Sequence, residues 1–278
     1  MAKIVVDSGC VYADDLRIQR GYNIEIVPLN MQIDEKSFID NENLDLAGYI
    51  NVMSESERIP KTSAPSPERY LQAYKGDESV FVVTLSSKLS GSNSSAEVAK
   101  HEYLKQNPKK FIHVFDSLSA GSAETVIAMK IQELIVKKLP DEEIVVQVEG
   151  FIKEMETIFI LEKYDNFVKT GRINPVVAKV ASMLSIKAIC KGVDGKPEFF
   201  DKARGFNKGL KKLVDEIASQ NKDFSNRNIV IMHVRDLEKA IMTKEEIYRR
   251  LDFKDIIISD ATGLCATYAM ENGIVVAY

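Results

Sequence analysis

Hydroxyl side chains that could hold an anion are concentrated in one short segment. Residues 84–96 read TLSSKLSGSNSSA and contain seven Ser or Thr residues, one Asn and one Gly. The residues just before a predicted helix are Ser90, Gly91, Ser92 and Asn93. Free backbone N–H groups and the helix dipole favour an anion at such a position, and a glycine lets the backbone approach a ligand closely. The segment predicts a site for a carboxylate or phosphate, with a solvated Ser-rich loop as the alternative.

The same segment contains a helix-capping pattern. Ser94 is followed three residues later by Glu97, which is the spacing of a capping box. We therefore expect the helix to begin near Ser94, with this pair serving its N-terminus and not a ligand.

Two other segments offer groups to an anion. Thr62 and Ser63 precede a predicted helix whose N-cap is Ser66, so they have no capping role of their own. Arg172 in TGRINP and Arg204 at the end of DKARG carry a permanent charge and five N–H donors each. An exposed arginine is usually only solvated, so both interpretations stay open for these two residues.

Motifs of several enzyme classes are absent from the sequence. It has no GxGxxG, GxxxxGK(S/T), HExxH or GxSxG segment, so dinucleotide, P-loop, zincin and hydrolase chemistry lack their parts. None of the three histidines neighbours a hydroxyl cluster, and the three cysteines lie far apart without a CxxC pair. We therefore predict no catalytic residue, no metal site and no cofactor.

The elements that must position these groups follow an α/β pattern. In the first half of the chain, short apolar runs of strand length alternate with segments of helical periodicity, which is typical of a mainly parallel sheet. In the second half, SIKAICK and KPEFFDKAR flank the turn GVDG and predict an antiparallel hairpin within a mixed α/β unit. We expect two α/β domains, residues 1–150 and 151–278.

Small polar residues follow three of the predicted strands. These pairs are Asp7-Ser8, Ser86-Ser87 and Asp116-Ser117. Ligands bind outside the carboxyl ends of the strands in open α/β sheets, although each pair could also only cap the next helix. The three together predict a polar crevice at this edge of the sheet.

Charge and hydropathy limit the partners. The formal net charge is −4 without a long Lys/Arg run, which argues against a nucleic acid as the main partner. The N-terminus lacks an apolar run of signal-peptide length, and no uninterrupted apolar stretch reaches the roughly 20 residues that span a bilayer. We expect a cytoplasmic protein without a transmembrane segment, and leave transient membrane contact open.

The order of these segments resembles the DegV family over nearly the whole chain. The segments that carry the resemblance are VVDSG, KTSAPSPERY, LSSKLSGSNSSA, VFDSLSAGSAE, TGRINPVVAKVASMLSIKAI and DGKPEFFDKAR. The resemblance implies a two-domain α/β protein, not itself an enzyme, that binds one long-chain fatty acid such as palmitate, stearate or oleate in a buried tunnel. It also implies a partner, a bacterial fatty acid kinase, which phosphorylates the presented acid to an acyl phosphate for phospholipid synthesis.

The resemblance also assigns residues to the two ends of the fatty acid. It places Thr62, Ser63, Arg172, Arg204 and the loop of Ser90, Gly91, Ser92 and Asn93 at the carboxyl head group. The tail needs an apolar lining, which VVAKVASMLSIKAI could supply. The candidate lining residues are Val180, Met183, Leu184 and Ile186, and an ordinary core stripe is the alternative for them.

The C-terminal segment departs from the family pattern. Family members have a His in a GTH-x-GPG type segment, whereas this chain reads ATYAMENGIVVAY and has Tyr268 at that place. A neutral tyrosine donates one hydrogen bond but cannot become cationic near pH 7. Two other hypotheses therefore stay open: an enzyme or kinase subunit acting on a small phosphorylated or carboxylated metabolite, and a divergent family member with another ligand or no kinase partner.

Overall fold

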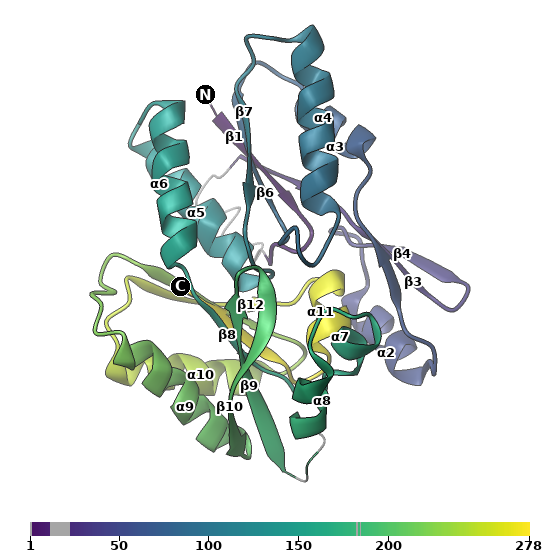
Figure 1. Ribbon diagram of the computed structural model, residues 1–278, viewed down its shortest axis with the longest axis vertical. Coiled ribbons are helices and arrows are strands. Elements are labelled where there is room, and N and C mark those ends of the chain that lie inside the picture. The colour runs from purple at the N-terminus through teal and green to yellow at the C-terminus, as the bar shows by residue number, and fades with distance from the viewer. Residues whose placement is uncertain (1, 12–22, 182, 184) are drawn as a thin grey trace.

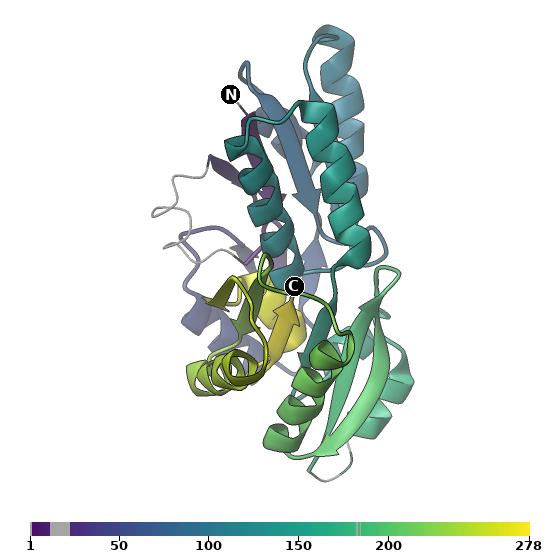
Figure 2. The ribbon, with the colours of Figure 1, turned by 90° about the vertical axis from the view of Figure 1, so that its left-hand side faces the viewer.

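The computed structural model describes residues 2–11, 23–181, 183 and 185–278, and in this part of the chain the strands form three sheets. The first sheet with its helices fills the upper half of the molecule in Figures 1 and 2, and the second sheet with its helices fills the lower half. The arrangement confirms the predicted α/β fold.

The first sheet has the strand order β2-β1-β6-β7, and every neighbouring pair is parallel. Its strands are β1 (Ala2–Asp7), β2 (Ile24–Val27), β6 (Ser79–Thr84) and β7 (Ile112–Asp116). Helices α3 (Pro67–Ala73) and α4 (Ser92–Gln106) cover one face, and α5 (Ser122–Val136) and α6 (Asp141–Glu154) cover the other (Figure 1). The predicted mainly parallel sheet is confirmed.

The second sheet is mixed and has the order β10-β9-β8-β13-β11-β12. Its strands are β8 (Thr157–Ile160), β9 (Ile186–Val193), β10 (Lys196–Arg204), β11 (Asn228–His233), β12 (Asp255–Asp260) and β13 (Ile274–Ala277). Strands β9 and β10 form the predicted antiparallel hairpin. Helices α9 (Phe206–Ser219) and α10 (Leu237–Arg250) pack on one face of this sheet.

The opposite face of the second sheet packs against the N-terminal half of the chain. Phe159 and Met232 from this face share a core with Val126 and Met129 of α5. Three further short helices join that core, namely α7 (Asp165–Lys169), α8 (Pro175–Ala181) and α11 (Gly263–Ala269). The two sheets are therefore joined by an apolar interface and not only by a linker.

The third sheet was not foreseen from the sequence. It is antiparallel, with the order β4-β3-β5, and consists of β3 (Asn30–Ile33), β4 (Lys36–Ile39) and β5 (Lys61–Ser63), with α2 (Leu46–Glu55) inserted before β5. The run YNIEIVPL reads as one strand, but β2 ends at Val27 because Pro28 cannot donate a ladder hydrogen bond. Pairing of Met31 with Thr62 fixes where β5 presents Thr62.

The predicted domain division stays a prediction, and we propose a small change to it. A cut after residue 150 would divide α6, whose Ile144, Val148 and Ile152 are buried in the core below the first sheet. The link between α6 and β8, residues 155–156, separates the strands of the two large sheets. We propose that the boundary falls there.

A buried carboxylate, Asp7, fixes the loop that follows β6. Asp7 accepts hydrogen bonds from the backbone N–H groups of Gly9 and Leu85, each 2.9 Å long, and from the Ser92 hydroxyl. The Ser92 oxygen in turn lies 2.6 Å from the hydroxyl of Tyr70. Because Asp7 ends β1 and Leu85 follows β6, the carboxylate ties the loop of residues 85–92 to the sheet.

The helix that follows this loop, α4, starts two residues earlier than the sequence predicted. Helix α4 begins at Ser92 with Gly91 as N-cap, and not near Ser94. The carbonyl of Gly91 accepts the first helical bond from Ser95, and the Ser90 hydroxyl accepts from the Ser92 N–H. Ser94 is exposed in the first turn.

We expect Ser92→Ala to destabilise the protein by about 1–3 kcal/mol, because it removes one donor from a buried carboxylate and one partner from Tyr70. Ser94→Ala, an exposed change in the same helical turn, is the matched control and should stay within about 0.5 kcal/mol of the parent. Urea unfolding measures both. Equal stability of the two variants would contradict the anchoring role of Asp7.

A second buried carboxylate, Asp40, caps helix α11. It accepts hydrogen bonds from the N–H groups of Gly263 at 2.7 Å and Leu264 at 3.0 Å. Burial raises the pKa of Asp40 to about 6 from its ordinary 3.8, and these N–H donors oppose part of that rise. The folded protein therefore holds this proton more tightly than the unfolded chain does.

A raised carboxyl pKa predicts that Asp40 contributes most to stability below about pH 4 and that this contribution is lost as the pH rises to about 6. The free energy of unfolding of the parent, relative to Asp40→Asn, should fall across this window by on the order of 3 kcal/mol. Urea unfolding at a series of pH values measures it. Asp45→Asn, at the exposed N-cap of α2, is the control. A difference that stays flat or rises with pH would refute the prediction.

Candidate ligand-binding site

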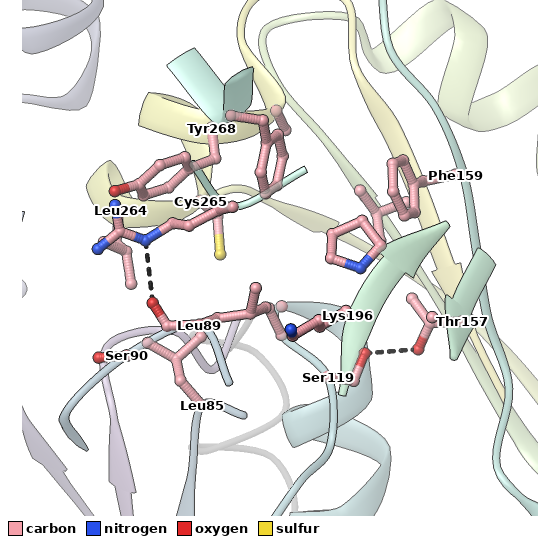
Figure 3. A pocket seen from close by; sticks show the side chains of 18 of the residues that line it. Leu85, Leu89, Ser90, Ser119, Thr157, Phe159, Lys196, Leu264, Cys265 and Tyr268 are labelled. Atoms are coloured by element: carbon pink, nitrogen blue, oxygen red, sulfur yellow. Dashed lines mark hydrogen bonds between the residues drawn. The ribbon is translucent and has the colours of Figure 1, made fainter. Parts of the chain in front are cut away.

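A cavity of about 380 Å³ lies between the two large sheets, a volume within the range of about 300 to 1,000 Å³ that small-molecule pockets have (Figure 3). Its wall is formed by the loops after β6 and β7, by β5, β8, the β9–β10 hairpin, β11, β13 and the helices α7 and α11. Most of the wall is apolar. The larger apolar lining residues are Leu29, Leu85, Leu89, Leu118, Phe159, Leu161, Phe167, Met232, Leu264 and Val275.

One side of the cavity carries a polar cluster formed by Thr62, Arg172 and Tyr268. The hydroxyls of Thr62 and Tyr268 lie 2.9 Å apart, and the Arg172 guanidinium carbon lies 5.4 Å from the centre of the Tyr268 ring. Ser90 and Gly91 line the same cavity. This cluster joins three segments that are more than 90 residues apart in the sequence.

Arg172 is held in place by its own hydrogen bonds. Its Nε donates to the carbonyl of Leu89 at 2.9 Å, and its Nη1 donates to the carbonyl of Thr170 at 3.5 Å. A guanidinium has five N–H donors, so three stay without a partner among the described residues. A fixed cation with unused donors at the wall of an apolar cavity is suited to an oxyanion.

The charge of the wall has one sign. Among the lining residues that the structure describes, the charged side chains are Arg172 and Lys196, and both are cationic. Lys196 begins β10 and is exposed to solvent, whereas Arg172 is half-buried. The cavity therefore favours an anion that also has a large apolar part.

A cysteine in the wall is not set up as a nucleophile. Burial raises the pKa of the Cys265 thiol well above its ordinary value, and the thiol donates to the carbonyl of Gly9 at 3.2 Å. A neutral thiol in this position contributes apolar surface to the wall. Neither a histidine nor a carboxylate of the described chain lines the cavity.

Several residues predicted for the head group lie away from the cavity wall. Ser63 is exposed on β5, on the opposite side of the strand from Thr62, as the alternation along a strand requires. The Ser92 hydroxyl is occupied by Asp7, and Asn93 donates to the Thr84 hydroxyl at 3.1 Å. Arg204 is exposed at the end of β10. The structure brings Thr62, Ser90, Gly91, Arg172 and Tyr268 together, and does not bring Ser63, Ser92, Asn93 or Arg204 to them.

The predicted apolar lining also lies elsewhere. Met183 is 50% exposed, Ile186 is half-buried at the start of β9, and neither lines the cavity. Val180 packs against the interface core, and Leu184 lies outside the described residues. The apolar wall comes instead from elements such as β8 and α11, where Phe159 and Leu264 face the cavity. The sequence of residues 157–161, TIFIL, is typical of a strand, but it does not indicate which face of that strand meets a ligand.

Two findings concern metals and membranes. In the part of the chain that the structure describes, no three His, Cys, Asp or Glu residues are grouped so that they could hold a metal ion. Of the helices among the described residues, none has the length and apolar character to cross a bilayer.

Comparison with known proteins extends over the whole chain. A protein of Streptococcus pyogenes serotype M18, named a DegV domain-containing protein, is 36% identical over 277 residues, which cover 99% of this chain and 98% of that protein. Two solved structures are similar over 100% of this chain and 99% of their own. One is a DegV family protein from Ruminococcus gnavus, described with vaccenic acid, with a TM-score of 0.93 and 34% identity. The other is the fatty acid kinase (Fak) B3 protein from Streptococcus pneumoniae, loaded with linoleic acid, with a TM-score of 0.91 and 32% identity.

The family model described as "Uncharacterised protein, DegV family" matches residues 1–278. The sequence resemblance is thus confirmed, and the chain belongs to the DegV family.

Proposed function

We propose that this protein binds one long-chain fatty acid, with the carboxylate at Thr62, Arg172 and Tyr268 and the hydrocarbon chain along the apolar wall. The observation that carries the proposal is a mainly apolar cavity whose charged lining side chains, among the described residues, are both cationic. Burying a chain of about 16 carbons at about 0.8 kcal/mol per CH₂ offers on the order of 12 kcal/mol before the costs of binding. The similar proteins of R. gnavus and S. pneumoniae, described with vaccenic and linoleic acid, support this ligand class.

The carboxylate is the costly part of such a ligand, because it leaves water. Arg172 supplies charge and unused donors at one point of the wall. The Thr62–Tyr268 hydroxyl pair has two protons and uses one in its mutual hydrogen bond, so the second proton is available to a ligand oxygen. Tyr268 thus serves a head group by donation alone, without the charge that a histidine could bring.

We further propose that the protein presents the acid to a fatty acid kinase and performs no catalysis itself. The likeness to the S. pneumoniae fatty acid kinase (Fak) B3 protein supports the kinase partner. The neutral Cys265 thiol and the absence of a histidine or carboxylate from the described wall support the binding role.

Because kinases draw on a nucleoside triphosphate, we place the protein in the cytoplasm. The apolar wall argues against an enzyme acting on a small phosphorylated metabolite.

We expect the purified protein to release about one equivalent of a long-chain fatty acid on solvent extraction, and the delipidated protein to take up palmitate or oleate; mass spectrometry measures both. Ala120→Phe places a large side chain on the cavity wall and should reduce uptake. Val146→Phe, on the exposed face of α6, adds the same group elsewhere and is the control. A protein that releases no lipid and takes up neither acid would refute the proposal.

We expect Arg172→Met to weaken palmitate binding about 10-fold or more, because a hydrogen bond to a charged group contributes about 1.5–3 kcal/mol. Binding of hexadecanol, which has no carboxylate, should change much less. Arg204→Met, an exposed arginine away from the cavity, is the matched control and should retain both affinities. Equal losses for the acid and the alcohol would show that Arg172 only supports the loop at Leu89.

A further inference from the structure

A second polar group lies in the cavity wall, away from the first. The hydroxyls of Ser119, in the loop between β7 and α5, and Thr157, the first residue of β8, are 2.8 Å apart. Figure 3 shows Ser119 and Thr157 on one side of the pocket and Tyr268 and Ser90 on the other. The cavity thus has two polar groups separated by apolar wall.

One of the two hydroxyl protons of the Ser119–Thr157 pair has no acceptor among the described residues. Two hydroxyls have two protons, and the bond between them uses one. Neither hydroxyl has another hydrogen-bond partner among the described residues. Ser119 is 8% exposed and Thr157 is 6% exposed, so the second proton has little access to bulk water. A buried donor without an acceptor is costly, and an acceptor on a bound ligand would remove that cost.

The strand beside the pair leaves it uncovered. A Cβ atom at Gly192, on β9, would lie 3.5 Å from the Thr157 Cβ and 3.8 Å from the Ser119 Oγ. Both are ordinary contact distances, so an alanine fits there, but it would occupy the space next to the hydroxyls. Gly192 itself lines the cavity. The glycine therefore keeps the pair open to whatever fills the cavity.

The chemistry of the pair selects the kind of acceptor. One hydroxyl proton cannot compensate a second buried carboxylate, which needs several donors and a charged partner, and the exposed charge of Lys196 stays in water. A neutral oxygen needs one donor. A neutral oxygen on the acyl chain, some distance from its carboxylate, matches what the pair offers.

We propose that the cavity takes an acyl chain bearing a hydroxyl or oxo group distant from the carboxylate, and that Ser119, Thr157 and Gly192 recognise this oxygen. The inference rests on the fatty acid binding proposed above and specifies its substrate class. Hydroxyls elsewhere on the chain would meet apolar wall and lose hydrogen bonds with water, so the preference depends on the position of the oxygen.

The test compares delipidated protein binding to palmitate and to a series of hydroxypalmitates with the hydroxyl stepped along the chain, by competition and native mass spectrometry. At least one isomer should bind about fivefold tighter than palmitate, the factor that corresponds to one net hydrogen bond of about 1 kcal/mol. Isomers with the hydroxyl on either side of that position should bind more weakly than palmitate.

Variants separate recognition from a structural role. Ser119→Ala and Thr157→Val should each abolish the preference for that isomer, measured as the ratio of its affinity to the affinity of palmitate in the same variant. Gly192→Ala, which leaves both hydroxyls in place, should reduce the same preference, and it keeps the test decisive if one of the other variants fails to fold. A fall in affinity that is equal for palmitate and the hydroxylated acids would mean that the pair only links the two sheets, and would overturn the inference.

The outcomes also separate this inference from the function on which it rests. If palmitate binds and no hydroxylated isomer binds better, the second polar group does not recognise a ligand oxygen, while fatty acid binding stands. If neither palmitate nor any isomer binds, both proposals fall.

Discussion

The proposed site depends on the hydrogen bonds that the buried carboxylate of Asp7 accepts. Burial raises the pKa of Asp7, and the Ser92 hydroxyl and the N–H groups of Leu85 and Gly9 oppose that rise by donating to it. Leu85 lies in the loop after β6, which lines the cavity, and this loop continues to Leu89, whose carbonyl accepts a hydrogen bond from Arg172. One buried carboxylate therefore links the end of the first strand, through a single loop, to the cation of the proposed head-group site.

The cavity exists because two sheets meet through an interface that does not close completely. Apolar side chains of the second sheet and of α5 and α11 pack into one core, while Gly91, Gly121, Gly192 and Gly195 line the cavity and supply no side chains to fill it. The polar groups lie at separate points of this wall. A ligand of matching chemistry would be a chain with an anionic end, and the hydroxyl pair at Ser119 and Thr157 adds a second point of recognition.

Much of the fold could be predicted because it follows from local patterns of apolar, polar and turn-forming residues in the sequence. The alternation of apolar runs and helical segments predicted the parallel sheet, and GVDG between two strand patterns predicted the β9–β10 hairpin. The third sheet was not predicted because its strands are only three or four residues long and because β5 pairs with a strand about 30 residues earlier in the sequence. The start of α4 was misplaced because a local capping pattern at Ser94 competes with the long-range anchoring of Ser92 by Asp7.

The sequence by itself determined the family, the α/β class and the residue types of the proposed anion site, since these depend on composition, periodicity and the order of motifs. It could not decide which hydroxyls face the cavity. Thr62 and Ser63 are adjacent hydroxyl residues on β5, and successive side chains of a strand point to opposite faces. Thr62 therefore faces the cavity and Ser63 faces solvent, which is decided by the pairing of β5 within its sheet. The Ser92 hydroxyl donates a hydrogen bond to the carboxylate of Asp7, which lies 85 residues earlier in the sequence. Arg172 is held at the site by its hydrogen bond to the carbonyl of Leu89, which is 83 residues away. Contacts at such separations follow from packing between elements, and only the tertiary structure decides them.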